Sequence, residues 1–193
     1  MRIAILLYDG FDELDAVGPY EVFQTAGDLG GEMEASLRTV DPVSTVTASH
    51  GLTVAPDGRL EEYEADLVLV PGGGWNTDPD EPGARREFES GKIPDLLAEI
   101  HEETTVASVC TGAMLLAAAG ILNNRPATTH HSAKEELSVF ADVRNDRIVD
   151  DGDVLTAGGV TAGLDLALYL VRTHCEEGIG EAVADELEYQ PRV

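Results

Sequence analysis

Residues 106–120 read VASVCTGAMLLAAAG, and this stretch decides the fold class. An apolar, β-branched run ends at Val109, and an apolar helix pattern begins two residues after Cys110. The cysteine therefore occupies a sharp turn between a buried strand and a helix, beside unpaired N–H groups and the positive end of the helix dipole. Such surroundings lower the pKa of a thiol and favour the thiolate. We expect Cys110 to be a nucleophile, with a buried structural cysteine as the alternative.

Outward from this stretch, short apolar runs alternate with helix-like segments along the chain. This alternation indicates a mainly parallel α/β sheet sandwiched between helices. Two turn signals, His50-Gly51 and Asp151-Gly152, predict hairpins that form an antiparallel edge or flap. The expected strands are 2–7, 35–40, 67–70, 105–109 and 154–157, and the expected helices are 18–26, 84–100, 112–122, 161–173 and 180–188.

The composition limits the class of protein. Of the 193 residues, 43% are hydrophobic, which is enough for one core, so we expect a single domain over residues 1–193. Thirty-seven acidic side chains against twelve basic ones give a net charge of −25, which disfavours nucleic acid and anionic membranes as partners. Because the acids are spread through every segment, we interpret them as the solvated surface of a halophilic protein.

The apolar start of the chain reaches Asp9 too soon for a signal peptide. No uncharged apolar stretch approaches the roughly 20 residues needed to span a bilayer. We therefore expect a cytoplasmic protein without a membrane partner. In that compartment Cys110 and Cys175 are expected to be free thiols rather than a disulfide.

Two segments besides Cys110 follow expected strands at the edge of the sheet where ligands bind in open α/β proteins. Pro71-Gly72-Gly73-Gly74 follows Val70, and its glycines could turn backbone N–H groups toward a developing oxyanion, although an ordinary glycine turn is the simpler interpretation of the glycines alone. Residues 8–19 contain several acids, any of which would act as acid or base if burial raised its pKa. These acids are Asp9, Asp12, Glu13 and Asp15.

A histidine pair follows the loop that is closed by Pro126. His130 is a candidate base or thiolate partner for Cys110. His131 is interpreted as a helix-start or surface residue. No metal-binding spacing such as H-E-x-x-H accompanies the pair, so we expect no metal.

Taken together, these segments resemble the ThiJ/PfpI superfamily. The similarity spans residues 3–170 and is greatest to the isonitrile hydratase branch. The motifs that show it are LeuAspAlaValGlyPro (14–19), ProGlyGlyGly (71–74), SerValCysThrGlyAla (108–113), AlaThrThrHis (127–130) and LeuThrAlaGlyGlyValThrAlaGlyLeuAsp (155–165).

The resemblance implies a flavodoxin-like fold, similar to class I glutamine amidotransferases, a homodimer and no cofactor. It implies that Asp15 is a carboxylic acid beside Cys110 and that His130 lies near the thiol. It also implies that the backbones of Gly73 and Thr111 form an oxyanion hole.

The neighbours of these residues are then candidates for a pocket that binds a small-molecule substrate. They are Gly72, Gly74 and His131. His131 stands where the isonitrile hydratase pattern commonly has tryptophan, so the pocket departs from that pattern.

Three functions are compatible with these residues. The first is cofactor-free hydration of an isonitrile to an N-substituted formamide. The second is conversion of methylglyoxal or another dicarbonyl, by a glyoxalase- or deglycase-like enzyme, but the branches with that activity usually have Glu where this chain has Asp15. The third is a redox or stress sensor in which Cys110 is oxidised reversibly. A glutamine amidotransferase is disfavoured because the tripeptide His174-Cys175-Glu176 ends a helix.

Overall fold

The computed structural model describes residues 1–192. The strands of its central sheet, in sheet order, are β10 (Ile148–Asp150), β11 (Val154–Ala157), β7 (Thr105–Val109), β6 (Leu67–Val70), β1 (Arg2–Leu6), β2 (Glu34–Thr39) and β5 (Gly58–Arg59). Every neighbouring pair is parallel except β10 and β11. Two-stranded pairs are formed by β3 (Val46–Thr47) with β4 (Thr53–Val54), and by β8 (Pro126–Ala127) with β9 (Asp142–Val143).

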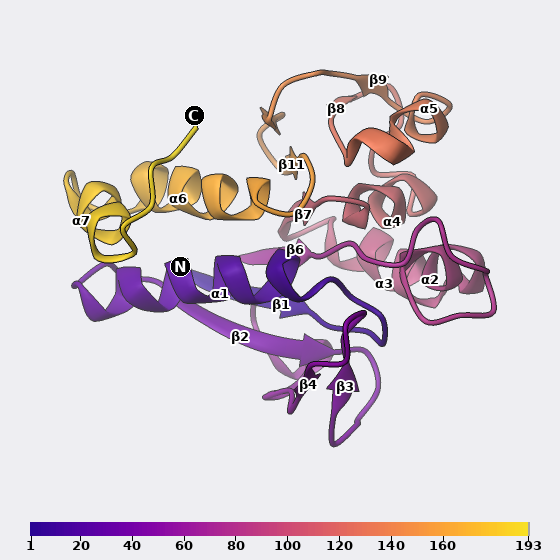
Figure 1. Cartoon of the computed structure of the whole chain (residues 1–193), viewed down its shortest axis with the longest axis horizontal. Coiled ribbons are helices and arrows are strands. Elements are labelled where there is room, and N and C mark those ends of the chain that lie inside the picture. The colour runs from indigo at the N-terminus through magenta and orange to yellow at the C-terminus, as the bar shows by residue number, and fades with distance from the viewer. Residues whose placement is uncertain (193) are drawn as a thin grey trace.

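Helices cover both faces of the sheet (Figure 1). One layer consists of α1 (Glu13–Asp28), α6 (Ala162–His174) and α7 (Ile179–Glu186), and the other of α2 (Ala84–Ser90), α3 (Lys92–Ile100) and α4 (Gly112–Ala118). The short helix α5 (Lys134–Leu137) and the 3₁₀ turns Leu60–Glu62 and His131–Ala133 lie in connections. The predicted flavodoxin-like fold is confirmed, and both predicted hairpins are present as β3–β4 and β10–β11.

Three predicted helices differ from the structure, and the first of them, 112–122, ends at Ala118. Helix α1 begins at Glu13 rather than at residue 18, because the Asp12 side chain caps it by accepting a hydrogen bond from the Leu14 amide at 3.1 Å. Glu13 and Asp15 therefore lie on a helix and not in a loop. The segment 84–100 is two helices, because Gly91 adopts a left-handed conformation with φ of +77°.

The core positions the functional edge of the sheet. Strands β6 and β11 are buried along their whole length, as expected for strands covered on both faces. The register places Val70 beside Ser108, so the carboxyl ends of β6 and β7 lie side by side. Residues that follow these strands, Pro71 and Cys110 among them, therefore converge at one edge.

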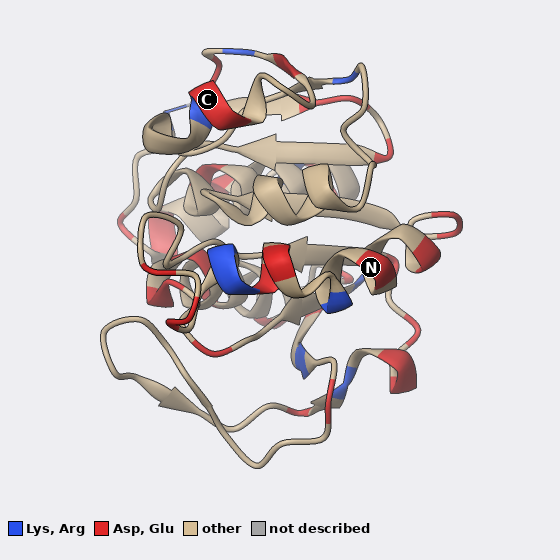
Figure 2. Cartoon of the chain, turned by 90° about the vertical axis from the view of Figure 1, so that its right-hand side faces the viewer, with Lys and Arg blue, Asp and Glu red and all other residues tan. Residues whose placement is uncertain are grey.

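The charged residues lie mainly on the helices and connecting loops, whereas the central strands are nearly free of them (Figure 2). This distribution agrees with the interpretation of the acids as surface residues. No helix within residues 1–192 combines the length and the apolar character needed to cross a membrane.

Candidate active site

Cys110 occupies the predicted turn between β7 and α4. Its backbone adopts a left-handed conformation with φ of +58°, which is uncommon for a residue other than glycine. The Cys110 amide donates to Gly158 O at 2.9 Å and the Thr129 hydroxyl donates to Cys110 O at 2.7 Å. These bonds hold the strained turn in place and leave the cysteine 7% exposed.

Asp15 projects from the first turn of α1 and is completely buried. Its Oδ2 accepts a hydrogen bond from the Gly72 amide at 2.9 Å. Oδ1 has no partner within normal hydrogen-bond geometry, although the Cys110 thiol lies close enough to stabilise the carboxylate. The structure therefore brings together the acid and the thiol that the sequence analysis paired.

The electrostatics of this pair differ from the prediction for a thiol at a helix start. Burial, assisted by the charge of Asp12, raises the pKa of Asp15 to about 7. Burial and the neighbouring Asp15 carboxylate raise the pKa of Cys110 to about 12. The expected lowering of the thiol pKa is wrong, because desolvation and a like charge outweigh the backbone donors. Near neutral pH Asp15 is therefore only partly ionised, and the Cys110 thiol keeps its proton.

Two backbone amides hydrogen-bond to the Cys110 sulfur and oppose this rise in pKa, those of Thr111 and Val160. Val160 adopts φ of +44°, a conformation that is a genuine outlier for a β-branched residue and costs about 1–3 kcal/mol. The surrounding fold therefore keeps Val160 in a strained backbone conformation, and this conformation directs its amide at the Cys110 sulfur. Sequence analysis missed this role of Val160, since nothing in a GlyGlyVal stretch shows which residue takes the left-handed conformation.

The glycine turn serves the site through its backbone. Gly72 leaves no room for a side chain, because a Cβ there would lie 2.5 Å from the Thr111 amide. The Gly73 amide, predicted to face an oxyanion, donates instead to the Thr111 hydroxyl at 3.1 Å. Gly74 lies farther along, where a Cβ would approach Gly83 to 2.8 Å. It lines a separate hollow beside the β3–β4 hairpin.

His130 follows Thr129, whose hydroxyl contacts Cys110 O, but the His130 side chain is hydrogen-bonded elsewhere. Its Nδ1 is 2.8 Å from the Ser132 hydroxyl and accepts from the Ser132 amide at 3.3 Å. Its ring packs against Gly159, where a Cβ would lie only 2.3 Å from the imidazole. Burial, and then His131, lower the pKa of His130. His131 is exposed and its ring centroid is 4.1 Å from that of His130, so the two rings form one surface.

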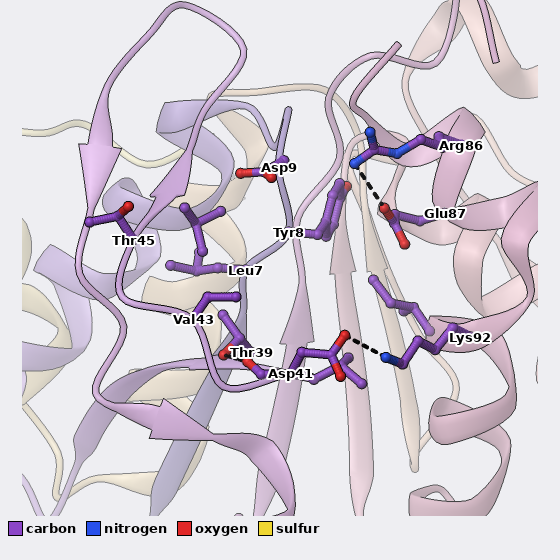
Figure 3. Close-up of a pocket in the computed structure, with 13 residues that line it drawn as sticks. Leu7, Tyr8, Asp9, Thr39, Asp41, Val43, Thr45, Arg86, Glu87 and Lys92 are labelled. Atoms are coloured by element: carbon purple, nitrogen blue, oxygen red, sulfur yellow. Dashed lines mark hydrogen bonds and ion pairs between the residues drawn. The ribbon is translucent and has the colours of Figure 1, made fainter. Parts of the chain in front are cut away.

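Tyr8 lies two residues beyond the end of β1 and is a further site residue that sequence analysis missed. Its hydroxyl donates to Pro71 O at 2.7 Å, which connects it to the glycine turn. Burial, and then the charges of Asp15 and Cys110, raise the pKa of Tyr8 well above its ordinary value, so the phenol stays neutral. On its other side Tyr8 lines a pocket of about 160 Å³ at the ends of β1 and β2 (Figure 3). Its position immediately after the expected strand 2–7 was the available signal.

Three side chains beside the site could approach a metal ion. Ligand atoms of Asp12, Glu13 and His50 lie within 4.8 Å of one another. Glu13 already accepts from the His50 amide at 2.7 Å, contacts its Nδ1 at 2.7 Å and accepts from the Ser49 hydroxyl at 3.2 Å. Although burial raises it, hydrogen bonding to His50 lowers the pKa of Glu13 to about 2. These contacts connect the β3–β4 hairpin to the start of α1.

Cys175 is a free thiol, as is Cys110. It follows the last residue of α6, as the sequence analysis expected for His174-Cys175-Glu176. Its sulfur packs beside Gly31, where a Cβ would lie 3.0 Å away, and burial raises its pKa. Cys175 is therefore a packed residue remote from Asp15.

The fold and this geometry define a class: flavodoxin-like α/β proteins in which a cysteine at a strand–helix turn faces a buried carboxylic acid. The chain belongs to the DJ-1/PfpI family, whose model matches residues 1–173. The resemblance stated from the motifs is thereby confirmed.

Particular relatives show what the chain is similar to. The isonitrile hydratase of Pseudomonas putida is 32% identical over 194 residues, which cover 99% of this chain and 79% of that protein. The HTH-type transcriptional regulator GbdR of Pseudomonas aeruginosa PAO1 is 27% identical over 97% of this chain, and the match covers 50% of the regulator. The crystal structure of a ThiJ/PfpI family protein from Pseudomonas syringae has a TM-score of 0.83 and 27% identity, and covers 100% of this chain and 76% of that one. The family and its enzyme relative support an enzymatic role.

Proposed function

We propose that this protein is a cofactor-free hydratase that converts an isonitrile to an N-substituted formamide, with Cys110 as nucleophile and Asp15 as acid and base. The observation that carries the proposal is the buried pair itself: an acid with a pKa of about 7 beside an uncharged thiol. An acid with this pKa both donates and accepts a proton near neutral pH. The match to isonitrile hydratase over nearly the whole chain supports the same reaction.

The first half of the reaction adds the thiol to the isonitrile carbon. Asp15 donates its proton to that carbon, the Cys110 sulfur forms a bond to it, and the thiol proton passes to Asp15. The product is a thioimidate in which the substrate carbon carries one hydrogen, the sulfur and a double bond to nitrogen. Hydrogen bonds from the Thr111 and Val160 amides stabilise the sulfur as charge develops on it.

The second half adds water. The water oxygen bonds to the same carbon, Asp15 gives the proton that it received from the thiol to nitrogen, and Asp15 then takes a proton from the water. The carbon–sulfur bond then breaks, the formamide carbonyl forms, and the thiol regains its proton. One isonitrile and one water give one formamide, with no oxidation or reduction. The Gly73 amide can serve the developing oxygen charge only after it leaves the Thr111 hydroxyl.

The test is formamide formation from an alkyl isonitrile, followed by proton NMR. We expect turnover by the purified protein, loss of at least about 100-fold in Asp15→Asn, and none above background in Cys110→Ala. Cys175→Ser is the matched control, since it removes the other thiol and should retain full activity. Equal rates for the wild type and Cys110→Ala would exclude the proposal.

Dicarbonyl conversion is measured on the same samples. Asp15 is shorter than the Glu of the dicarbonyl-processing branches, which favours the isonitrile reaction. If the protein consumed methylglyoxal but no isonitrile, dicarbonyl conversion would become the preferred function. The sensor alternative is disfavoured by the structure, since sensor cysteines are exposed and have a low pKa, whereas Cys110 is 7% exposed and has a raised pKa.

We also propose that the protein is a homodimer. Leu14 and Val17 on α1 are 37% and 39% exposed, and Leu52 in the β3–β4 hairpin is 46% exposed. The hydrogen bonds between His50 and Glu13 hold this hairpin against the start of α1. Light scattering after size exclusion should give twice the chain mass, and Leu14→Asp with Val17→Asp should reduce it to one. A monomeric wild type would refute the dimer.

A further inference from the structure

A pocket of about 340 Å³ adjoins the candidate active site on the side of His130. This volume falls in the range of small-molecule sites. The wall has two parts, the glycine-rich segment before α6 and the segment around α5. The residues that line it are Thr128, Thr129, His130, His131, Lys134, Asn145, Asp146, Arg147, Gly158, Gly159 and Val160.

Three of these wall residues contact Cys110 directly. Gly158 O accepts the Cys110 amide at 2.9 Å, and the Thr129 hydroxyl donates to Cys110 O at 2.7 Å. The Val160 amide hydrogen-bonds to the sulfur. Cys110 itself does not line the pocket, but the backbone of its wall at Gly158 and Val160 directly contacts the nucleophile.

The pocket holds a cation that is not neutralised. Within residues 1–192, Lys134 forms no ion pair with a carboxylate, and its Nζ donates to Arg144 O at 3.3 Å and to Asn145 Oδ1 at 3.1 Å. Lys134 is half-buried, and an ammonium has three protons to donate, so one remains for a ligand.

The other lysine of the chain shows the contrast. Lys92 lies at the pocket at the ends of β1 and β2, where it forms an ion pair with Asp41 (Figure 3). Arg86, at the same pocket, contacts Glu87 at 3.4 Å. The cations of that pocket are already paired with carboxylates, whereas Lys134 is not.

The remaining charged groups of the Lys134 pocket are arranged to admit an anion. Arg147 is fixed by an ion pair with the buried Asp165 and by a hydrogen bond to the Thr161 hydroxyl at 3.1 Å. Asp146 is exposed and is the pocket's only lining carboxylate among the described residues. His131 adds a ring nitrogen at the rim. The lining thus offers one cation without a carboxylate partner, Lys134, one cation already paired with Asp165, Arg147, and one solvated acid.

We infer that this pocket binds a carboxylate carried by the substrate, with Lys134 as the principal contact and Arg147 behind it. The inference deepens the proposed function and rests on it for the identity of the reaction: the preferred isonitrile bears a carboxylate a few bonds from its reactive carbon. A single ammonium with one free proton suits a singly charged carboxylate. Because the rest of the surface repels anions, this pocket decides whether such a substrate reaches Cys110.

The first test does not depend on isonitrile chemistry. Iodoacetate and iodoacetamide alkylate a thiolate by the same displacement of iodide, and they differ in one negative charge. In a Cys175→Ser background, the ratio of their rate constants at Cys110 reports whether an anion is attracted to the site. We expect Lys134→Gln to lower the iodoacetate rate about five-fold and to leave the iodoacetamide rate unchanged.

Two variants make this test decisive. Lys92→Gln changes the net charge by the same amount at the other pocket and should leave the ratio unchanged. Lys134→Arg keeps the charge and should restore the ratio if Lys134→Gln has lowered it. Equal ratios in Lys134→Gln and Lys92→Gln would overturn the inference, even if isonitrile hydration has been demonstrated.

The second test uses turnover. An isocyano carboxylate should be hydrated with a lower KM than its methyl ester, and Lys134→Gln should remove the difference through KM with little change in kcat. Equal KM values for acid and ester in the wild type would overturn the inference. A protein that hydrates neither, yet retains the alkylation ratio, would refute the proposed function while keeping the carboxylate subsite.

Discussion

Replacing Asp15 by Asn should make the protein more stable at alkaline pH while it removes the proposed acid. The pKa of Asp15 rises from an ordinary 3.8 to about 7 because the carboxyl group is buried. The folded protein therefore binds this proton more tightly than the unfolded chain does. The resulting stabilisation is complete below pH 3.8 and is lost as the pH rises to about 7. A tenfold difference in proton affinity corresponds to about 1.4 kcal/mol, so the whole effect is about 4 kcal/mol.

The measurement compares the unfolding midpoints of the wild type and Asp15→Asn at pH 5 and pH 8.5. Both values lie above the sequence pI of about 4.2, where the protein would approach neutrality. From pH 5 to pH 8.5 the free energy of unfolding of the wild type should fall by about 3 kcal/mol, and that of the variant should not show this decrease. For a chain of this length that difference corresponds to about 5–10 °C in Tm.

The matched control is Asp185→Asn, which alters an exposed aspartate on α7 and should give the same difference from the wild type at both pH values. If the difference in unfolding midpoint between Asp15→Asn and the wild type were no larger at pH 8.5 than at pH 5, the argument would be refuted. It would mean that Asp15 is already ionised at pH 5 and cannot act as the proposed acid.

Three further predictions concern the thiol, the packing and the surface. Asp15→Asn should shift the pH dependence of Cys110 alkylation by iodoacetamide to lower pH, because the carboxylate that raises the thiol pKa is removed. An unchanged pH dependence would show that burial alone raises the pKa of the thiol. Gly112→Ala should lower Tm by about 5 °C or more, since its Cβ would lie 2.1 Å from Val70 O, whereas Gly158→Ala, whose Cβ would lie 3.7 Å from Arg147 O, should change it little. Raising KCl from 0.1 to 1 M should raise Tm, because it shortens the Debye length from about 10 to 3 Å around a chain of net charge −25; a flat response would refute the halophilic interpretation.

The strand, cysteine and helix around Cys110 could be predicted because the signal is local. The apolar run, the turn and the helix follow one another in the sequence, and the structure reproduces them. The start of α1 could not be predicted from the sequence. Gly18-Pro19 resembles a loop, and nothing in the sequence distinguishes Asp12, the capping residue, from the other acids nearby. A single hydrogen bond decided where the helix begins.

The chemistry of the thiol could not be predicted because it depends on distance through space. Asp15 and Cys110 meet through the register of parallel strands, and neither the burial of the pair nor the contribution of Asp12 can be read from spacing. The same holds for Gly73, whose amide is engaged by the Thr111 side chain. Sequence patterns identified the participants, whereas the direction of their pKa shifts follows from the burial and the neighbouring charges in the structure.

Val160 has a consequence for attempts to engineer this protein. Glycine or asparagine would adopt its backbone conformation with less strain, so a search for heat resistance would favour either substitution at this position. Valine, by contrast, samples few backbone conformations, and its rigidity keeps the amide directed at the Cys110 sulfur. A more stable variant with glycine here would let that amide swing away in solution. Thermal selection alone would then remove a hydrogen bond from the nucleophile, and screens for stability should include thiol reactivity as a second criterion.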